Sequence, residues 1–185
     1  SKYFNFINKM KLVTNLKGVP ICTFIAVVSL VVFGLYVSKI IKAVPCGKTI
    51  ISVFNSTFVH LDIYHLFANL LALYSLSRVE ESMGMSNFAF LLMFLFAFNC
   101  ITEVLLYKMF PNLPCSVGLS GILFGIITWE MVSKQKLDIT MFLSIIFMVV
   151  WPSLQNSKVS FRSHASGAIS GIIGGLLWYY IFKNK

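Results

Sequence analysis

The chain has 185 residues, of which 58% are hydrophobic and 11% are charged, so it has too few polar side chains to cover a soluble surface of this size. Its formal net charge is +9, but the lysines and arginines stand singly or in pairs between apolar runs, as they do in loops beside anionic lipid headgroups. The composition therefore predicts an integral membrane protein and argues against a soluble domain or a nucleic-acid-binding protein.

Apolar runs divide the chain into predicted membrane spans, each of which needs about 20 apolar residues. They are, in chain order and approximately, Pro20–Val37, Val59–Ser77, Phe88–Tyr107, Ser116–Val132, Ile139–Trp151 and His164–Phe182. A half-polar connection over 38–58 is expected to lie in the membrane interface. The sequence thus predicts one all-α membrane domain, 1–185, with a tail over about 1–18, a core of six transmembrane helices over 19–182 and a tail over 183–185.

Positive charges in the loops predict the orientation of this multi-pass domain. With the N-terminus in the cytoplasm, nine lysines and arginines lie on the cytoplasmic side and six on the other. Positive loops are retained in the cytoplasm, so both termini are expected there. Cys46 and Cys115 then share the opposite side, where a disulfide is one open alternative. The four cysteines lack the CxxC spacing of a metal or redox pair.

Polar residues inside predicted spans are costly and are therefore candidates for function. All three histidines, His60, His65 and His164, lie at the starts of the second and sixth spans, and the segment 118–121 (Gly-Leu-Ser-Gly) opens the fourth. Even-numbered spans begin on the same side of the membrane. These motifs are therefore expected to meet at one membrane face.

Glycine spacing brings a serine and a histidine together. Gly167 and Gly171 follow His164 at i+3 and i+7, and Gly121 directly follows Ser120. Stripes of small residues let membrane helices approach closely. If the two helices cross at these glycines, Ser120 comes within hydrogen-bonding reach of His164, and a neutral imidazole that removes the hydroxyl proton activates a serine nucleophile.

A Ser-His dyad is predicted, since no carboxylate is placed to orient His164, and neither a metal nor a cofactor is expected because no H-E-x-x-H motif is present. His60, five residues before His65, is interpreted as a helix-start residue. An oxyanion needs preorganised donors. The candidate donors are Asn69 and His65, together with the backbone at Gly118 and Ser120. The supporting residues are His60, Phe124, which is expected to pack on His164, Gly121, Gly167 and Gly171.

Three further polar positions have structural interpretations with alternatives left open. Asn69 could instead join neighbouring helices by a hydrogen bond. Glu103, near the outer end of the third span, is interpreted as a structural residue that reaches the interface, with a proton-relay role as the alternative. Arg78, Glu80 and Glu81 are interpreted as a solvated helix end with some capping or loop-pinning role, and Arg162 is counted as a loop charge.

Taken together, these motifs resemble the rhomboid intramembrane serine proteases. The matching elements, over about residues 55–175, are His60-x4-His65-x3-Asn69, Gly118-Leu-Ser120-Gly121, His164-x2-Gly167-x3-Gly171 and Glu80-x3-Gly84. The resemblance implies a six-helix basic core, with Ser120 as nucleophile, His164 as general base, and His65 with Asn69 at the oxyanion site. It also implies that single-span membrane proteins are the substrates and that the fifth helix gates entry.

The sequence departs from the family pattern at two places. Phe124 stands where the family often has Tyr, and the connection over 38–58 lacks a Trp-Arg pair. The leading hypothesis is a serine endopeptidase that cleaves transmembrane segments. The alternatives are a non-catalytic rhomboid-like protein that binds or escorts membrane clients, and a small transporter or channel. The polar groups occupy only one end of the spans, which argues against a transporter.

Overall fold

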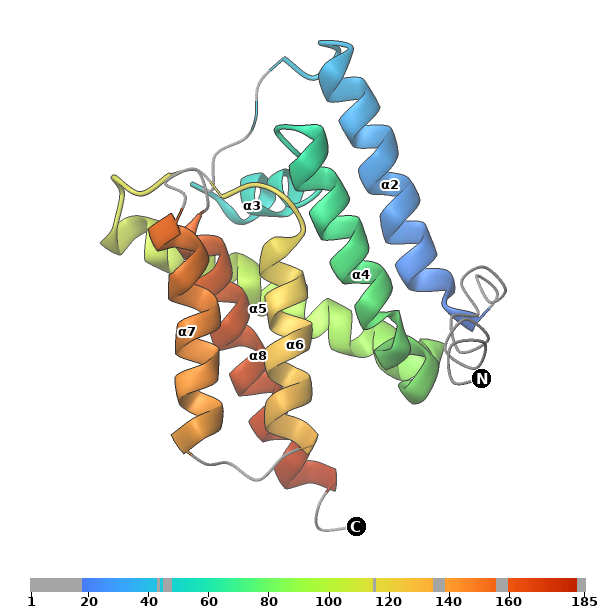
Figure 1. Cartoon of the computed structure of the whole chain (residues 1–185), viewed down its shortest axis with the longest axis vertical. Helices are drawn as coiled ribbons and strands as arrows, with labels where there is room; N and C mark the ends of the chain where they lie inside the picture. The colour runs from blue at the N-terminus through green and yellow to red at the C-terminus, as the bar shows by residue number, and fades with distance from the viewer. Residues whose placement is uncertain are drawn as a thin grey trace, which may run out of the picture.

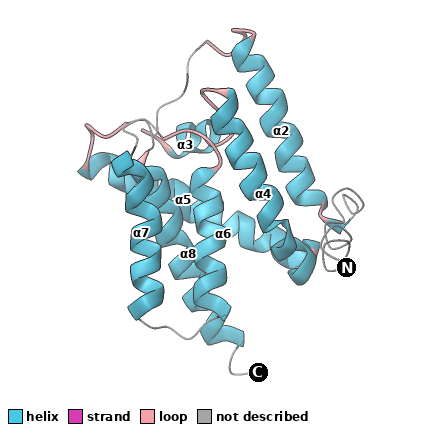
Figure 2. Cartoon of the chain, viewed as in Figure 1, coloured by secondary structure: helices cyan, strands magenta, loops and turns pink. Residues whose placement is uncertain are grey.

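The computed structural model describes residues 18–42, 44, 48–114, 116–134, 139–155 and 160–182, and in these residues it contains helices and loops without any strand (Figure 2). The helices are α2 (Pro20–Val37), α3 (Ile50–Ser56), α4 (Ile63–Met83), α5 (Met85–Met109), α6 (Ser120–Lys134), α7 (Ile139–Gln155) and α8 (Phe161–Phe182). The all-α prediction is confirmed for this part of the chain. Cys46, Cys115 and both predicted tails, apart from Gly18, lie outside it.

Helices α6, α7 and α8 stand side by side, α2 and α4 form a pair beside them, and α5 passes behind both groups (Figure 1). Within the described residues, α2 and α5 are long and apolar enough to cross a membrane, and α7 has a shorter apolar stretch, Ile139–Pro152. Helix α6 has only 15 residues, and α4 and α8 carry more polar and small residues. The count of six spans therefore stays a prediction.

Several helix ends differ from the predicted ones because local caps decide them. The connection over 38–58 contains the short helix α3, which Thr49 and Ser52 begin with a reciprocal capping box. Helix α4 begins at Ile63 because the Asp62 side chain accepts a hydrogen bond from the backbone N–H of His65 at 2.8 Å. Pro152, predicted to end the fifth span, lies inside α7.

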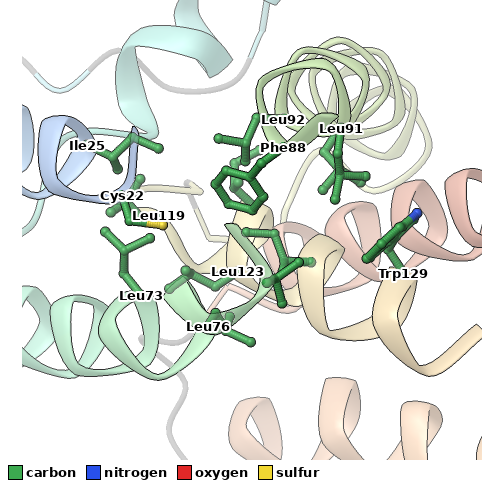
Figure 3. Packing of buried hydrophobic residues seen from close by; sticks show 14 residues of the cluster. Cys22, Ile25, Leu73, Leu76, Phe88, Leu91, Leu92, Leu119, Leu123 and Trp129 are labelled. Atoms are coloured by element: carbon green, nitrogen blue, oxygen red, sulfur yellow. The ribbon is translucent and has the colours of Figure 1, made fainter. Parts of the chain in front are cut away.

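The hydrophobic core lies between α2, α4, α5 and α6 (Figure 3). Leu73 from α4, Phe88 from α5 and Leu119 from the segment just before α6 are all buried there. Leu119 is 1% exposed. Because Leu119 is fixed in this core, it also fixes the start of the helix that carries the next residue, Ser120.

Helices α6 and α8 cross at their glycines, as the small-residue stripes predict. A Cβ placed on Gly167 would lie 1.9 Å from the carbonyl oxygen of Gly121, and one on Gly171 would lie 2.3 Å from that of Gly125. The Thr128 hydroxyl, whose shortest hydrogen bond goes to the Phe124 carbonyl of its own helix at 2.8 Å, also lies 3.2 Å from the Ala168 carbonyl of α8. The two backbones are therefore in direct contact, and only glycine fits at the closest positions.

In the charged segment after the predicted second span, Arg78 and Glu81 are exposed as expected, but Glu80 is buried. The Glu80 side chain is 1% exposed, and its two carboxylate oxygens each accept a hydrogen bond at 2.8 Å from a backbone amide of α2, those of Ile21 and Cys22. These amides lie in the first turn of α2, where they have no partner inside the helix. The predicted capping role is therefore confirmed for Glu80, but Glu80 caps the start of α2 and not an end of its own helix, α4.

Candidate active site

Ser120 is the first residue of α6 and follows a tight turn. Gly118 has a φ of +90°, which favours glycine, and its N–H donates to the Ser56 carbonyl at 3.0 Å. The Ser120 side chain is half-buried. The serine hydroxyl is therefore held at the end of a buried helix, on a turn that α3 supports from behind.

His164 lies in the first turn of α8, where its side chain is 7% exposed. Its ring stacks on Phe124 of α6, with ring centroids 4.1 Å apart and planes inclined by 20°. The predicted packing of His164 on Phe124 is confirmed. Its Nδ1 atom is buried and has no hydrogen-bond partner among the described residues, so one ring nitrogen is available for a new bond.

Ser120 and His164 are near one another but not joined by a hydrogen bond in the described structure. The Ser120 Oγ atom instead lies 3.3 Å from Oγ of Ser163, the residue before His164. This follows from the crossing, because a Cβ on Gly121 would lie 3.0 Å from the Ser163 hydroxyl. Catalytic hydrogen bonds are often long without substrate and tighten in the complex. The Ser120–His164 bond stays a prediction.

His60 and His65 meet at the turn before Ser120. Their ring centroids are 5.0 Å apart with planes inclined by 63°, and a Cβ on Gly118 would lie 2.7 Å from His65 Nε2. His60 is not the helix start, since Asp62 caps α4. It lies in the loop before that helix and is fully buried. The structure thus brings three of the predicted residues together.

Asn69 is buried in α4, with a side chain that is 5% exposed. Its Nδ2 donates to the carbonyl oxygen of His65 at 2.9 Å, one turn earlier in the same helix. The side chain is therefore oriented by its own helix. Its predicted oxyanion role stays a prediction, and so does the alternative that it joins neighbouring helices.

A buried polar cluster, which sequence reasoning missed, lies next to Ser120 between α5 and α8. Its members are Asn99, Glu103, Ser116, Ser160, Arg162, Ser163 and Ser166. Ser163 and Ser166 are three residues apart on α8, and Asn99 and Glu103 are four apart on α5, so each pair shares a helix face. That spacing was the feature of the sequence from which the cluster could have been predicted. The interpretations of Glu103 as reaching the interface and of Arg162 as a loop charge are wrong, because each is 1% exposed.

Among the described residues, no group of three or more histidine, cysteine, aspartate or glutamate side chains is arranged to bind an ion. The chemistry that the site offers is that of a hydroxyl, an imidazole with an available nitrogen, and backbone donors at the start of α6.

The fold and the site together define a helical membrane protein in which a serine and a histidine come from two helices that cross at glycines. The model of the Rhomboid domain family matches residues 47–183, and the chain therefore belongs to the rhomboid family. A protein of Acanthamoeba polyphaga mimivirus, whose name assigns it provisionally to the rhomboid proteins, is 29% identical over 128 residues, which cover 69% of this chain and 74% of that protein. The resemblance found in the motifs is confirmed. Helix α2 precedes the matched range.

Proposed function

We propose that this protein is an intramembrane serine endopeptidase that cleaves transmembrane segments of single-span membrane proteins. Membership of the rhomboid family supports the proposal. The observation that carries it is the stacking of His164 on Phe124, since Phe124 belongs to the same helix as Ser120 and lies one turn below it. The helix of the serine therefore holds the imidazole that would act as its base.

In the proposed reaction, His164 takes the proton from the Ser120 hydroxyl while Oγ attacks the scissile carbonyl. His164 then gives the proton to the departing amine, and a water molecule, activated in the same way, hydrolyses the acyl-enzyme. For this step the Ser120 hydroxyl would turn from Ser163, whose Oγ atom lies 3.3 Å from it, toward the imidazole. The backbone N–H of Ser120, with His65 and Asn69, would stabilise the oxyanion. The predicted donor at Gly118 is already used, because its N–H donates to the Ser56 carbonyl at 3.0 Å.

The proposal includes the arrangement in the membrane. One domain with six spans and a cytoplasmic N-terminus would place the starts of α6 and α8 on the opposite side of the membrane. The domain would contact the bilayer, and the reaction would need no cofactor. The turn before Ser120 is built from backbone and histidine rings. A substrate segment would have to unwind to present its carbonyl there, which favours small or helix-breaking residues at the cut.

Labelling by a fluorophosphonate serine probe tests the proposal. The full-length protein in detergent is expected to react, and Ser120→Ala and His164→Ala are each expected to abolish the reaction, because the first removes the nucleophile and the second its base. Ser75→Ala is the matched control, since this serine is exposed on α4 and bonds only to its own helix. Folded wild-type protein that stays unlabelled in detergent and in lipid would refute the proposal.

The second candidate is a non-catalytic protein that binds membrane clients. The observation that favours it is the present orientation of Ser120, whose hydroxyl faces Ser163 and not His164. Co-purification of a membrane client separates the two candidates. Client binding that survives Ser120→Ala, in a wild-type protein that does not react with the probe, would favour the escort function.

The Phe124 ring gives a graded prediction within the proposed enzyme. Phe124→Leu is expected to slow probe labelling by about three- to tenfold, because an aromatic stack contributes about 0.5–1.5 kcal/mol beyond its buried area. Phe124→Tyr keeps the ring and is expected to label within about twofold of the wild type. Equal labelling rates for Phe124→Leu and wild type would show that the stack does not orient His164.

A further inference from the structure

Glu103 of α5 and Arg162 of α8 form a charged pair inside the protein. Each is 1% exposed, and Arg162 Nε lies 3.4 Å from Glu103 Oε1. Burying two charges is costly, and their attraction offsets that cost only when further hydrogen bonds satisfy the remaining donors and acceptors. Arg162 Nε has no hydrogen-bond partner among the described residues, so these bonds come from the two terminal nitrogens of Arg162 and from the Glu103 carboxylate.

Arg162 holds the segment that leads to the serine. Its Nη2 donates to the Pro114 carbonyl at 2.9 Å, its Nη1 donates to the Phe110 carbonyl at 3.5 Å, and its guanidinium carbon lies 5.0 Å from the centre of the Tyr107 ring. Phe110 and Pro114 belong to the loop between α5 and α6. Arg162 itself precedes His164 by two residues, so one side chain links the approach to Ser120 with the start of the histidine helix.

Glu103 binds the same two segments from the other side. Its Oε1 accepts a hydrogen bond from Ser116, two residues before Gly118, and the Ser116 hydroxyl lies 2.7 Å from that of Ser160, just before α8. The single hydroxyl proton of Ser166 in α8 lies within reach of two acceptors, Asn99 Oδ1 at 2.8 Å and Glu103 Oε2 at 3.2 Å. The carboxylate therefore joins α5, the turn before Ser120 and the first turns of α8.

We infer that the Glu103–Arg162 pair positions Ser120 against His164, an inference that rests on the proposed function. The pair touches neither side chain of the dyad. It fixes the two backbone segments that carry them, at the end of the α6–α8 crossing where Ser120 and His164 lie. The glycine contacts fix how far apart the helices are, and the pair fixes how the turn before Ser120 is seated against the start of α8.

The inference requires an arginine at residue 162 and not merely a positive charge. A planar guanidinium offers five donors in a fixed fork, whereas an ammonium is a point charge on a flexible stem. Lysine would still neutralise Glu103, but it could not reach the carboxylate and the Phe110 and Pro114 carbonyls together. Arg162→Lys therefore keeps the buried charge balance and removes the positioning contacts.

The test compares probe labelling with thermal unfolding for Arg162→Lys in the full chain. We expect the first-order labelling rate to fall by about ten- to a hundredfold, since misplacing a reacting group by about 1 Å costs on the order of a hundredfold. The probe concentration for half-maximal rate is expected to stay unchanged, and so is the unfolding midpoint to within a few degrees. Arg78→Lys is the matched control, because Arg78 makes a bidentate pair with Glu130, at 2.7 and 2.6 Å, while its own side chain is 62% exposed.

The double variant Glu103→Gln with Arg162→Gln covers the case in which Arg162→Lys is unstable, because it leaves no unpaired buried charge. A folded double variant that labels slowly supports the inference. Wild-type labelling rates in any folded variant at Arg162 overturn it, as does a slow rate in Arg78→Lys. Absence of labelling in the wild type would instead overturn the proposed function, and this inference with it.

Discussion

Gly167→Ala is expected to lower the free energy of unfolding by more than about 3 kcal/mol and to abolish probe labelling. Overpacking a well-packed site costs about 1–3 kcal/mol when side chains can adjust. Here the new Cβ would lie 1.9 Å from the Gly121 carbonyl oxygen and 2.7 Å from its carbonyl carbon. Backbone atoms cannot rotate away, so α6 and α8 would have to separate. Thermal unfolding followed by circular dichroism in detergent measures the loss.

Gly34→Ala is the control for that substitution. Gly34 lies inside α2, and a Cβ there would have no atom within 4 Å. Alanine in an open helical position stabilises by about 0.5–1 kcal/mol relative to glycine, so an unchanged or slightly higher midpoint is expected. A Gly167→Ala protein as stable and as reactive as Gly34→Ala would mean that the helices do not cross as closely as described.

Glu80→Ala is expected to destabilise the protein by about 3–6 kcal/mol and to release α2 from the core. The substitution leaves the Ile21 and Cys22 amides without their acceptor, and each hydrogen bond to a charged group contributes about 1.5–3 kcal/mol. Unfolding midpoints, together with limited proteolysis of the connection between α2 and α3, measure the effect.

Substitution of the neighbouring Glu81 distinguishes the loss of this cap from a general effect of removing a negative charge. Glu81 is exposed, and Glu81→Ala is expected to change the free energy of unfolding by less than about 0.5 kcal/mol. Glu80→Gln keeps an acceptor but removes the charge, so an intermediate loss is expected. Equal stability of Glu80→Ala and Glu81→Ala would contradict the cap.

The sequence predicts the helices well where an apolar run or a repeated spacing determines them. The glycine stripe of α8 predicts its crossing with α6, because a periodic absence of side chains has one geometric consequence. The short helix α3 escapes prediction because its capping box is local and its apolar residues are few. The end of α7 could not be predicted either, since hydropathy does not show whether a helix continues past Pro152.

In the candidate site, too, some residues could be placed from the sequence and others could not. His60, His65 and Gly118 could be placed together from the side of the membrane on which their spans begin, and the structure brings them together. Glu103 and Arg162 could not be paired, because each was interpreted from its immediate neighbours as a residue near water. Only the tertiary contact between α5 and α8 shows that both are buried.

The cap that Glu80 places on α2 also sets an order for assembly. The two amides of α2 and their acceptor are separated by 59 and 58 residues along the chain. During synthesis, α2 is therefore complete before Glu80 has been made, and its first turn must rely on water or headgroups in the meantime. Helix α2 thus acquires its cap only after the chain has been extended through most of α4.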